Sequence, residues 1–146
     1  MLLTTSEPTA LVDRYLLTEV GKYTLVFQAN WVIEILQVDQ SKVLKIPYYS
    51  PAILGIANYH NIFLTLVAGS QFLSEVQPVR TDHFTVVRLG GTIKSWQNTG
   101  VVIDRVLGYV VKKDLPTTQQ DLFVLANSQL LPNHLWQPLN RQLPHQ

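Results

Sequence analysis

The sequence predicts an all-β fold of two small β-barrels packed together, with one or two short helical turns. Short runs rich in Val, Ile, Leu, Tyr, Phe and Thr recur along the chain, separated by turn residues such as Gly, Pro, Asn and Asp. This pattern is typical of strands in barrels and sandwiches. The runs form two blocks of similar size, residues 14–67 and 83–140. Either block alone would bury only a marginal core, so we expect the two to share an interface within one domain.

The first block opens with a predicted β-hairpin. Its two runs, RYLLTEV and KYTLVFQA, meet at Gly21 and Lys22, which is a strand–turn–strand pattern. NWVIEILQV at 30–38 is rich in β-branched and aliphatic side chains and predicts a strand after one short helical turn. Residues 39–41 predict a turn, and VLKI at 43–46 predicts a short strand that the following proline ends.

A second hairpin is predicted in 53–67, ILGIANYHNIFLTLV. Two apolar runs flank four turn-like residues, Asn58, Tyr59, His60 and Asn61. Such residues favour a corner between buried strands. The polar link that follows, AGSQFLSEVQPVRTD, predicts a short helix or turn and then a connector.

The second block begins with FTVVRLGGTIKSW, which predicts a strand, a corner at Gly90 and Gly91, and a returning strand. GVVIDRVLGYVV at 100–111 is the most apolar strand candidate of this half. LFVLA at 122–126 and HLWQPLN at 134–140 close the chain.

Composition excludes several classes of protein. Eleven Lys and Arg against ten Asp and Glu give a net charge of +1, without the basic stripe typical of nucleic-acid binders. The lack of cysteine excludes disulfides, zinc–thiolate sites and thiol nucleophiles. Residues 1–13 resemble a loose leader rather than a signal peptide, and no apolar run reaches the roughly 20 residues of a membrane span. We therefore expect a soluble, cytoplasmic protein.

No catalytic, cofactor-binding or metal-binding pattern is present. The glycine-rich phosphate motifs and the G-x-S-x-G nucleophile motif are missing. No histidine has another His or Cys at metal-ligand spacing, and the carboxylates stand singly. We predict a protein that is not an enzyme and that holds no cofactor or metal. A site assembled from distant residues stays open as an alternative, and a deep pocket with His83 or His134 beside a carboxylate would indicate it.

Three segments match a known family pattern in unbroken order. NWVIEILQV carries V-x-E-V/I-L at Val32, Glu34 and Ile35, and ILGIANYHN carries L-x-G-x-x-N at Leu54, Gly55 and Asn58. GVVIDRVLGYV matches the pattern GLLVDRVLGVV nearly throughout, with identity at Gly100, Asp104, Arg105, Val106, Leu107 and Gly108. Over residues 14–111, and more weakly to 143, the chain therefore resembles the CheW-like domain family of chemotaxis adaptors.

The chain departs from this pattern as a divergent member would. His60 and Asn61 stand where the family has Arg-Gly, Thr65 replaces a proline, and Ala68 replaces an aspartate. Arginine offers a permanent charge and five donors, whereas histidine offers two ring nitrogens and a charge that depends on pH. If the family's arginine contacts a receptor, this chain has a weakened contact or a different partner. The segment after Val111 is also shortened.

The resemblance implies two intertwined, five-stranded SH3-like barrels in a single domain, residues 14–143. Barrel one would span about 14–70 with contributions from the C-terminal segment, and barrel two about 83–132. The implied function is that of a non-enzymatic adaptor in a chemotaxis, phototaxis or pilus-motility pathway. Its partners would be a methyl-accepting chemoreceptor-type protein and the regulatory domain of a CheA-type histidine kinase. It would bind no nucleic acid and insert into no membrane, and self-association stays open.

Eight residues are predicted as receptor or kinase interface candidates: Val32, Glu34, Gly55, Asn58, His60, Asn61, Asp104 and Arg105. Most have a purely structural alternative. The structural alternative for Val32 is a place in the core. For Glu34 it is a position on a solvated strand face, and for Gly55 it is a backbone bend or a close approach.

The structural alternative for Asn58 is a side-chain hydrogen bond that holds the turn. For His60 it is an exposed position at the hairpin corner with no function. Asp104 suits a bond to a turn backbone or to a basic residue, while Arg105 is expected as a surface contact. The tryptophans suit either interface anchors or core caps, and they are Trp31, Trp96 and Trp136.

A small nucleic-acid-binding barrel is the alternative function. Such barrels combine aromatic side chains with basic residues, and Tyr109 with Lys112 and Lys113 is the only segment of this kind. A basic surface patch would favour this alternative.

Overall fold

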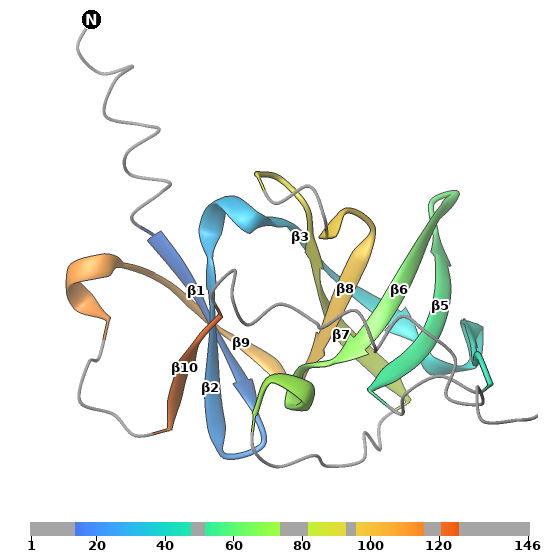
Figure 1. Cartoon of the computed structure of the whole chain (residues 1–146), viewed down its shortest axis with the longest axis horizontal. Coiled ribbons are helices and arrows are strands. Elements are labelled where there is room, and N and C mark those ends of the chain that lie inside the picture. Colours follow the sequence, from blue (N-terminus) through green and yellow to red (C-terminus); the bar gives the residue numbers. More distant parts are fainter. Residues whose placement is uncertain (1–13, 48–51, 74–81, 93–95, 116–120, 126–146) are drawn as a thin grey trace, which may run out of the picture.

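The computed structural model describes residues 14–47, 52–73, 82–92, 96–115 and 121–125 (Figure 1). Within these ranges the chain forms ten β-strands and several 3₁₀ turns, and it contains no α-helix. The predicted all-β class is therefore confirmed. Residues 1–13 and the closing segment 134–140, with His134 and Trp136, lie outside the described residues.

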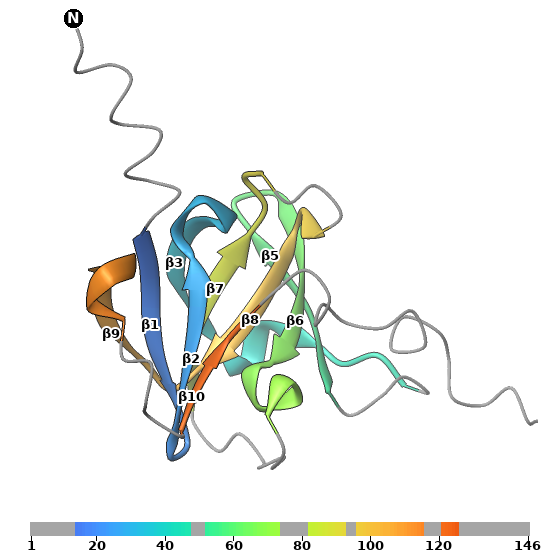
Figure 2. The same cartoon turned by 60° about the vertical axis from the view of Figure 1, so that its left-hand side comes forward.

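A four-stranded sheet combines the first two strands of the chain with its last two. Its strand order is β10-β2-β1-β9, and its members are β1 (Arg14–Val20), β2 (Tyr23–Gln28), β9 (Arg105–Val111) and β10 (Leu122–Val124). The predicted hairpin at Gly21 is present, with β1 and β2 antiparallel. Figure 2 shows the short β10 alongside β2, with which it pairs in parallel.

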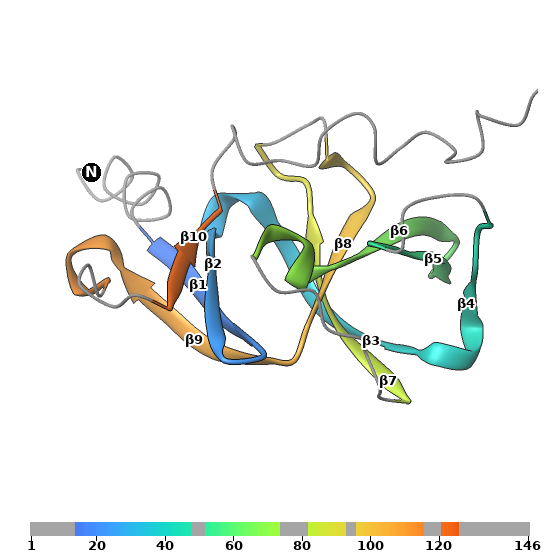
Figure 3. The same cartoon turned by 60° about the horizontal axis from the view of Figure 1, so that its bottom comes forward.

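The remaining strands form a six-stranded sheet of order β3-β7-β8-β6-β5-β4. They are β3 (Val32–Asp39), β4 (Val43–Leu44), β5 (Ile53–Tyr59), β6 (Ile62–Ala68), β7 (His83–Leu89) and β8 (Thr99–Ile103). One 3₁₀ turn, η2 (Gln40–Lys42), joins β3 at one edge directly to β4 at the other edge. The sheet therefore curls round on itself (Figure 3).

The predicted helical turns are also present. The turn η1 (Ala29–Trp31) precedes β3, and η3 (Gly69–Phe72) follows the second hairpin. A further turn, η5 (Lys112–Asp114), follows β9.

Two expectations need correction. The sheets do not follow the two blocks of the sequence, because β1 pairs with β9 and β3 pairs with β7. The predicted single strand 100–111 is two strands, β8 and β9, which Asp104 separates and which belong to different sheets. In addition, the strand that returns alongside β7 is β8, which begins at Thr99 and not directly after the corner at Gly90 and Gly91.

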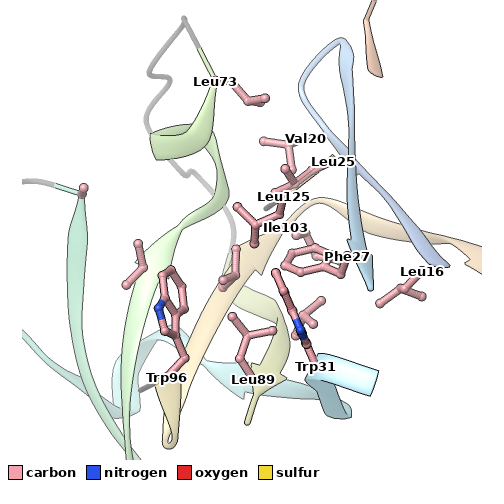
Figure 4. Close-up of a cluster of buried hydrophobic side chains, with 14 of the residues drawn as sticks. Leu16, Val20, Leu25, Phe27, Trp31, Leu73, Leu89, Trp96, Ile103 and Leu125 are labelled. Atoms are coloured by element: carbon pink, nitrogen blue, oxygen red, sulfur yellow. The ribbon is translucent and has the colours of Figure 1, made fainter. Parts of the chain in front are cut away.

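Two hydrophobic cores hold this architecture together. The inter-sheet core joins residues of both sheets and includes Phe27, Trp31, Leu89, Trp96 and Ile103 (Figure 4). The barrel core lies within the six-stranded sheet, and its members are Leu36, Val38, Ala57, Leu64, Leu66, Phe84, Val86 and Val102. Since all five residues of β8 are buried, this strand is covered on both faces. Trp31 and Trp96 are 4% and 5% exposed, so these two tryptophans are core residues.

Candidate functional site

The eight candidate residues lie in three places. Two stand at the start of β3, four in the β5–β6 hairpin and two at the β8–β9 junction. Val32 pairs with Leu89, Leu89 pairs with Thr99, and Thr99 pairs with Thr65. The start of β3 and the tip of the hairpin therefore share one end of the six-stranded sheet, although β7 and β8 separate them. The junction follows the far end of β8 (Figure 1).

At the start of β3, the strand bulges between Val32 and Glu34. Val32 is half-buried and packs against the inter-sheet core. The Oε2 atom of Glu34 accepts a hydrogen bond of 2.9 Å from Nη1 of Arg88, which lies opposite on β7. Arg88 is only 15% exposed, so this ion pair is partly sheltered from solvent.

The exposed apolar residues of β3 were not among the candidates. Ile33 is 43% exposed and Ile35 is 38% exposed. Their exposure could have been predicted from the alternation of side chains along a strand. Leu36 and Val38 point into the barrel, so the odd-numbered residues of β3 point outward.

The tip of the β5–β6 hairpin is a tight two-residue turn. Tyr59 pairs with Ile62, and the residues between them have positive φ angles, 50° at His60 and 66° at Asn61, as a type I′ turn requires. The Asn61 backbone N–H donates to Oδ1 of Asn58 at 3.1 Å, which confirms the predicted turn-holding role of Asn58. The His60 ring is exposed and stands edge-on to Tyr59, with ring centroids 4.2 Å apart.

The lower part of this hairpin explains three sequence features. A Cβ at Gly55 would lie 2.5 Å from the backbone oxygen of Leu44, so the predicted close approach is confirmed. The Thr65 N–H donates to the Asn98 carbonyl at 3.0 Å, a bond that the proline of the family pattern could not make. Ala68 is buried, so an aspartate there would need a partner.

The β8–β9 junction is tied to the first hairpin by Asp104 and Glu19. The Gly21 N–H donates to Oδ2 of Asp104 at 2.6 Å, and the Asp104 N–H donates to the Glu19 carbonyl at 2.8 Å. The predicted bond from Asp104 to a turn backbone is confirmed.

Arg105 is the most exposed candidate with an ionic partner. Its side chain is 68% exposed, and its Nε donates to Oε1 of Glu19 at 2.6 Å. This hydrogen bond is the main cause that lowers the pKa of Glu19 below its ordinary value of 4.5 and that raises the pKa of Arg105. Both groups are therefore charged at neutral pH. Glu19 was not predicted, because it is far from Arg105 in sequence.

Basic residues gather near the end of β9. The Arg14 guanidinium lies over the Tyr109 ring, 5.3 Å from its centroid. Lys112 and Lys113 follow in η5 and are exposed, together with Asp114. The features named for the nucleic-acid alternative thus lie close together.

For the alternative of an assembled catalytic site, the described residues include His83, whereas His134 lies outside them. His83 is exposed at the start of β7, opposite Asp39. The Asp39 carboxylate accepts from the Ser41 N–H and hydroxyl, and the backbone bond is the main cause that lowers its pKa. Across the described ranges, no three His, Cys, Asp or Glu side chains gather as metal ligands, and no helix is long and apolar enough to cross a membrane.

The family model for the CheW-like domain matches residues 14–124, a range that contains all eight candidates. No curated protein matches the chain. Among solved structures, the scaffolding protein TtCheW from Thermoanaerobacter tengcongensis superposes with a TM-score of 0.58 at 12% identity, covering 78% of this chain and 88% of that chain. At this low identity the superposition shows the shared fold.

Proposed function

Because this chain belongs to the CheW-like domain family, a family of chemotaxis-type scaffolds, we propose that it is a non-enzymatic adaptor between a chemoreceptor-type sensor and a CheA-type histidine kinase. The pathway would control chemotaxis, phototaxis or pilus motility. The family match over residues 14–124 is the observation that carries this proposal.

The arrangement of the candidates supports an adaptor with two partners. An adaptor must bind both partners at once, so its two surfaces must be separate. The residues at the start of β3 and in the β5–β6 hairpin share one end of the six-stranded sheet, and Asp104 and Arg105 follow its other end. We assign the first group to the receptor and the second group to the kinase.

The receptor surface differs from the family pattern at its most exposed point. His60 and Asn61 occupy the exposed turn in place of Arg-Gly. An arginine there would carry a permanent charge at neutral pH, which histidine lacks. If the family's arginine contacts a receptor, this chain has either a weakened contact at the hairpin tip or a different partner.

Binding measurements with separate partners test the assignment. The kinase regulatory domain and the cytoplasmic tip of a receptor from the same genome are titrated against the chain by calorimetry. His60→Arg should change the receptor dissociation constant by about tenfold, equivalent to about 1.4 kcal/mol, and leave kinase binding unchanged. Arg105→Ala should change the kinase dissociation constant by about tenfold and leave receptor binding unchanged. Circular dichroism checks that both variants fold, and failure of the wild-type chain to bind any such partner defeats the proposal.

A single-stranded nucleic-acid module is the second candidate function. The observation in its favour is the group formed by Arg14, Tyr109, Lys112 and Lys113. However, Arg14 already lies over the Tyr109 ring, and the whole chain has a net charge of only +1. Salt-sensitive retention on a polyanion column that Lys112→Glu abolishes would favour this function over the adaptor.

A further inference from the structure

The outer face of β4, β5 and β6 exposes two large apolar side chains, while Asn58 and Thr65 also point to this side. Leu44 is 70% exposed and Phe63 is 66% exposed, and the next large hydrophobic side chain among the described residues, Tyr109, is 46% exposed. Leu44 lies opposite Ile56 on β5, and Phe63 lies opposite Asn58, two residues further along the same strand. Residues at these positions point to one side of a sheet. We call Leu44, Ile56 and Phe63 the β4–β6 apolar face.

Further along β6, the same side of this strand is covered by the four-stranded sheet. Val67 lies four residues after Phe63 on β6 and therefore points to the same side. Val67 is fully buried in the inter-sheet core, against residues of the four-stranded sheet. The four-stranded sheet thus covers one end of β6, while Phe63 near the hairpin tip stays uncovered. Because Phe63 and Leu44 are exposed on the same side of the sheet, we take them together as a candidate interaction patch.

The charged side chains next to β4 are two lysines and one aspartate, and the Asp39 carboxylate interacts electrostatically with Lys42. The sequence contains no Asp or Glu between Asp39 and Glu75, whereas Lys42 and Lys45 flank β4 and both are exposed. The nearest carboxylate along the chain belongs to Asp39, and it is bonded to Ser41 at the end of β3. The carboxylate of Glu34 pairs with Arg88 on the strands at the opposite edge of the sheet.

We propose that the β4–β6 apolar face docks a protein partner whose surface presents an apolar side chain among carboxylates. The apolar centre removes Phe63 and Leu44 from water, and the carboxylates face Lys42 and Lys45. The choice of a protein as the partner rests on the proposed adaptor function. Leu44, Ile56 and Phe63 are not among the eight candidate residues, but the face adjoins one of them, Asn58, which lies opposite Phe63.

Two other occupants fit less well. In a two-fold contact between copies, the same patch meets itself, so the lysines of one copy would face those of the other without a carboxylate from this segment. A membrane would be entered through the hairpin tip, but that tip is formed by the polar residues His60 and Asn61.

A pair of matched peptides tests the proposal. Both form a helix with the same leucine face, and one has glutamates beside that face where the other has lysines. Titrations followed by NMR should show that the acidic peptide shifts the resonances of Leu44, Ile56 and Phe63. The lysine peptide should bind at least tenfold more weakly. Phe63→Ser should weaken acidic-peptide binding at least tenfold, and the double variant Lys42→Glu/Lys45→Glu should reverse the preference between peptides.

Leu107→Ser is the matched control, because Leu107 is also exposed, at 45%, but belongs to the four-stranded sheet. This variant should bind the acidic peptide like the wild type. Equal binding of the two peptides, no binding of either, or resonance shifts on another surface would overturn the proposal. Phe63-dependent binding to phosphatidylglycerol vesicles would assign the face to a membrane instead, and a Phe63-dependent dimer in sedimentation would assign it to a second copy.

The outcome is separable from that of the adaptor function. Receptor and kinase binding are measured with the wild type, whereas the peptide preference is measured through Phe63 and the lysines. A wild type that binds neither receptor nor kinase but discriminates the peptides would defeat the adaptor function and retain the docking surface. The converse result would retain the adaptor and reject the surface.

Discussion

The two residues at the tip of the β5–β6 hairpin both have positive φ angles, although neither is glycine. Side chains with a Cβ are disfavoured in this region, and asparagine tolerates it better than most. The turn-like character of Asn58 to Asn61 and the role of Asn58 were predictable, because both depend on neighbours within three residues. The exposure of Phe63 was not predictable from the sequence, since it depends on how far the four-stranded sheet extends along β6.

Replacing Asn61 with glycine should stabilise the protein. Glycine adopts the φ angle of 66° at this position without a Cβ penalty, and Asn-Gly-like turns are the preferred two-residue hairpins. The greater freedom of glycine in the unfolded chain offsets part of this gain. We expect the free energy of unfolding to rise by about 0.5 kcal/mol, measured by urea denaturation.

Asn58→Ala, in the same turn, should change the free energy of unfolding in the opposite direction. It removes the Oδ1 acceptor of the Asn61 N–H, so we expect a loss of about 0.5–1 kcal/mol. If Asn61→Gly lowers stability as well, the energetic reasoning about the type I′ turn is wrong.

At the scale of the elements, the chain from Gly100 to Val111 was predicted as one strand and forms two. The local pattern is apolar on both sides of Asp104 and Arg105, so period alone did not divide it. The division depends on the bonds from Asp104 to Gly21 and from Arg105 to Glu19, which join residues more than 80 positions apart. Burial shows the difference, since β8 is buried throughout and β9 alternates.

Two glycines of this segment should respond differently to alanine. A Cβ at Gly100 would lie 2.5 Å from Cγ1 of Val86 and 3.0 Å from Cδ2 of Leu66, whereas a Cβ at Gly108 would meet no atom within 4 Å. Gly100→Ala should cost about 1–3 kcal/mol through overpacking. Gly108→Ala should cost about 1–3 kcal/mol through its φ of +136° alone.

A double-mutant cycle separates these two causes. Val86→Ala removes the methyl group that the new Cβ of Gly100→Ala would contact, so the pair should be less destabilised than the sum, by about 1 kcal/mol. Gly108→Ala combined with Val86→Ala should be additive within about 0.5 kcal/mol. Additivity in both pairs would show that crowding against Val86 does not determine the cost at Gly100.

At the scale of the whole molecule, the class of the fold was predictable and the composition of the sheets was not. Strand runs and turns are local properties, and most of them appear where the sequence predicts them. The pairing of β1 with β9 and of β3 with β7 joins distant segments, and alternation within a strand does not specify its partner. The chain crosses between the sheets at η1 and at Asp104, which interleaves the two halves.

This interleaving predicts that the two sheets unfold together. The inter-sheet core includes Phe27 and Leu25 from the four-stranded sheet and Val87, Leu89 and Val101 from the six-stranded sheet. Phe27 is fully buried. Phe27→Leu should lower the free energy of unfolding by about 1–2 kcal/mol. The loss should be equal for amide hydrogen exchange in β1 and in β7, because both sheets contribute to the inter-sheet core. Leu44→Ser, at an exposed site, should leave exchange in both sheets unchanged. Retained protection of β7 in the Phe27 variant, with loss confined to β1 and β2, would show instead that the six-stranded sheet is stable by itself through its barrel core.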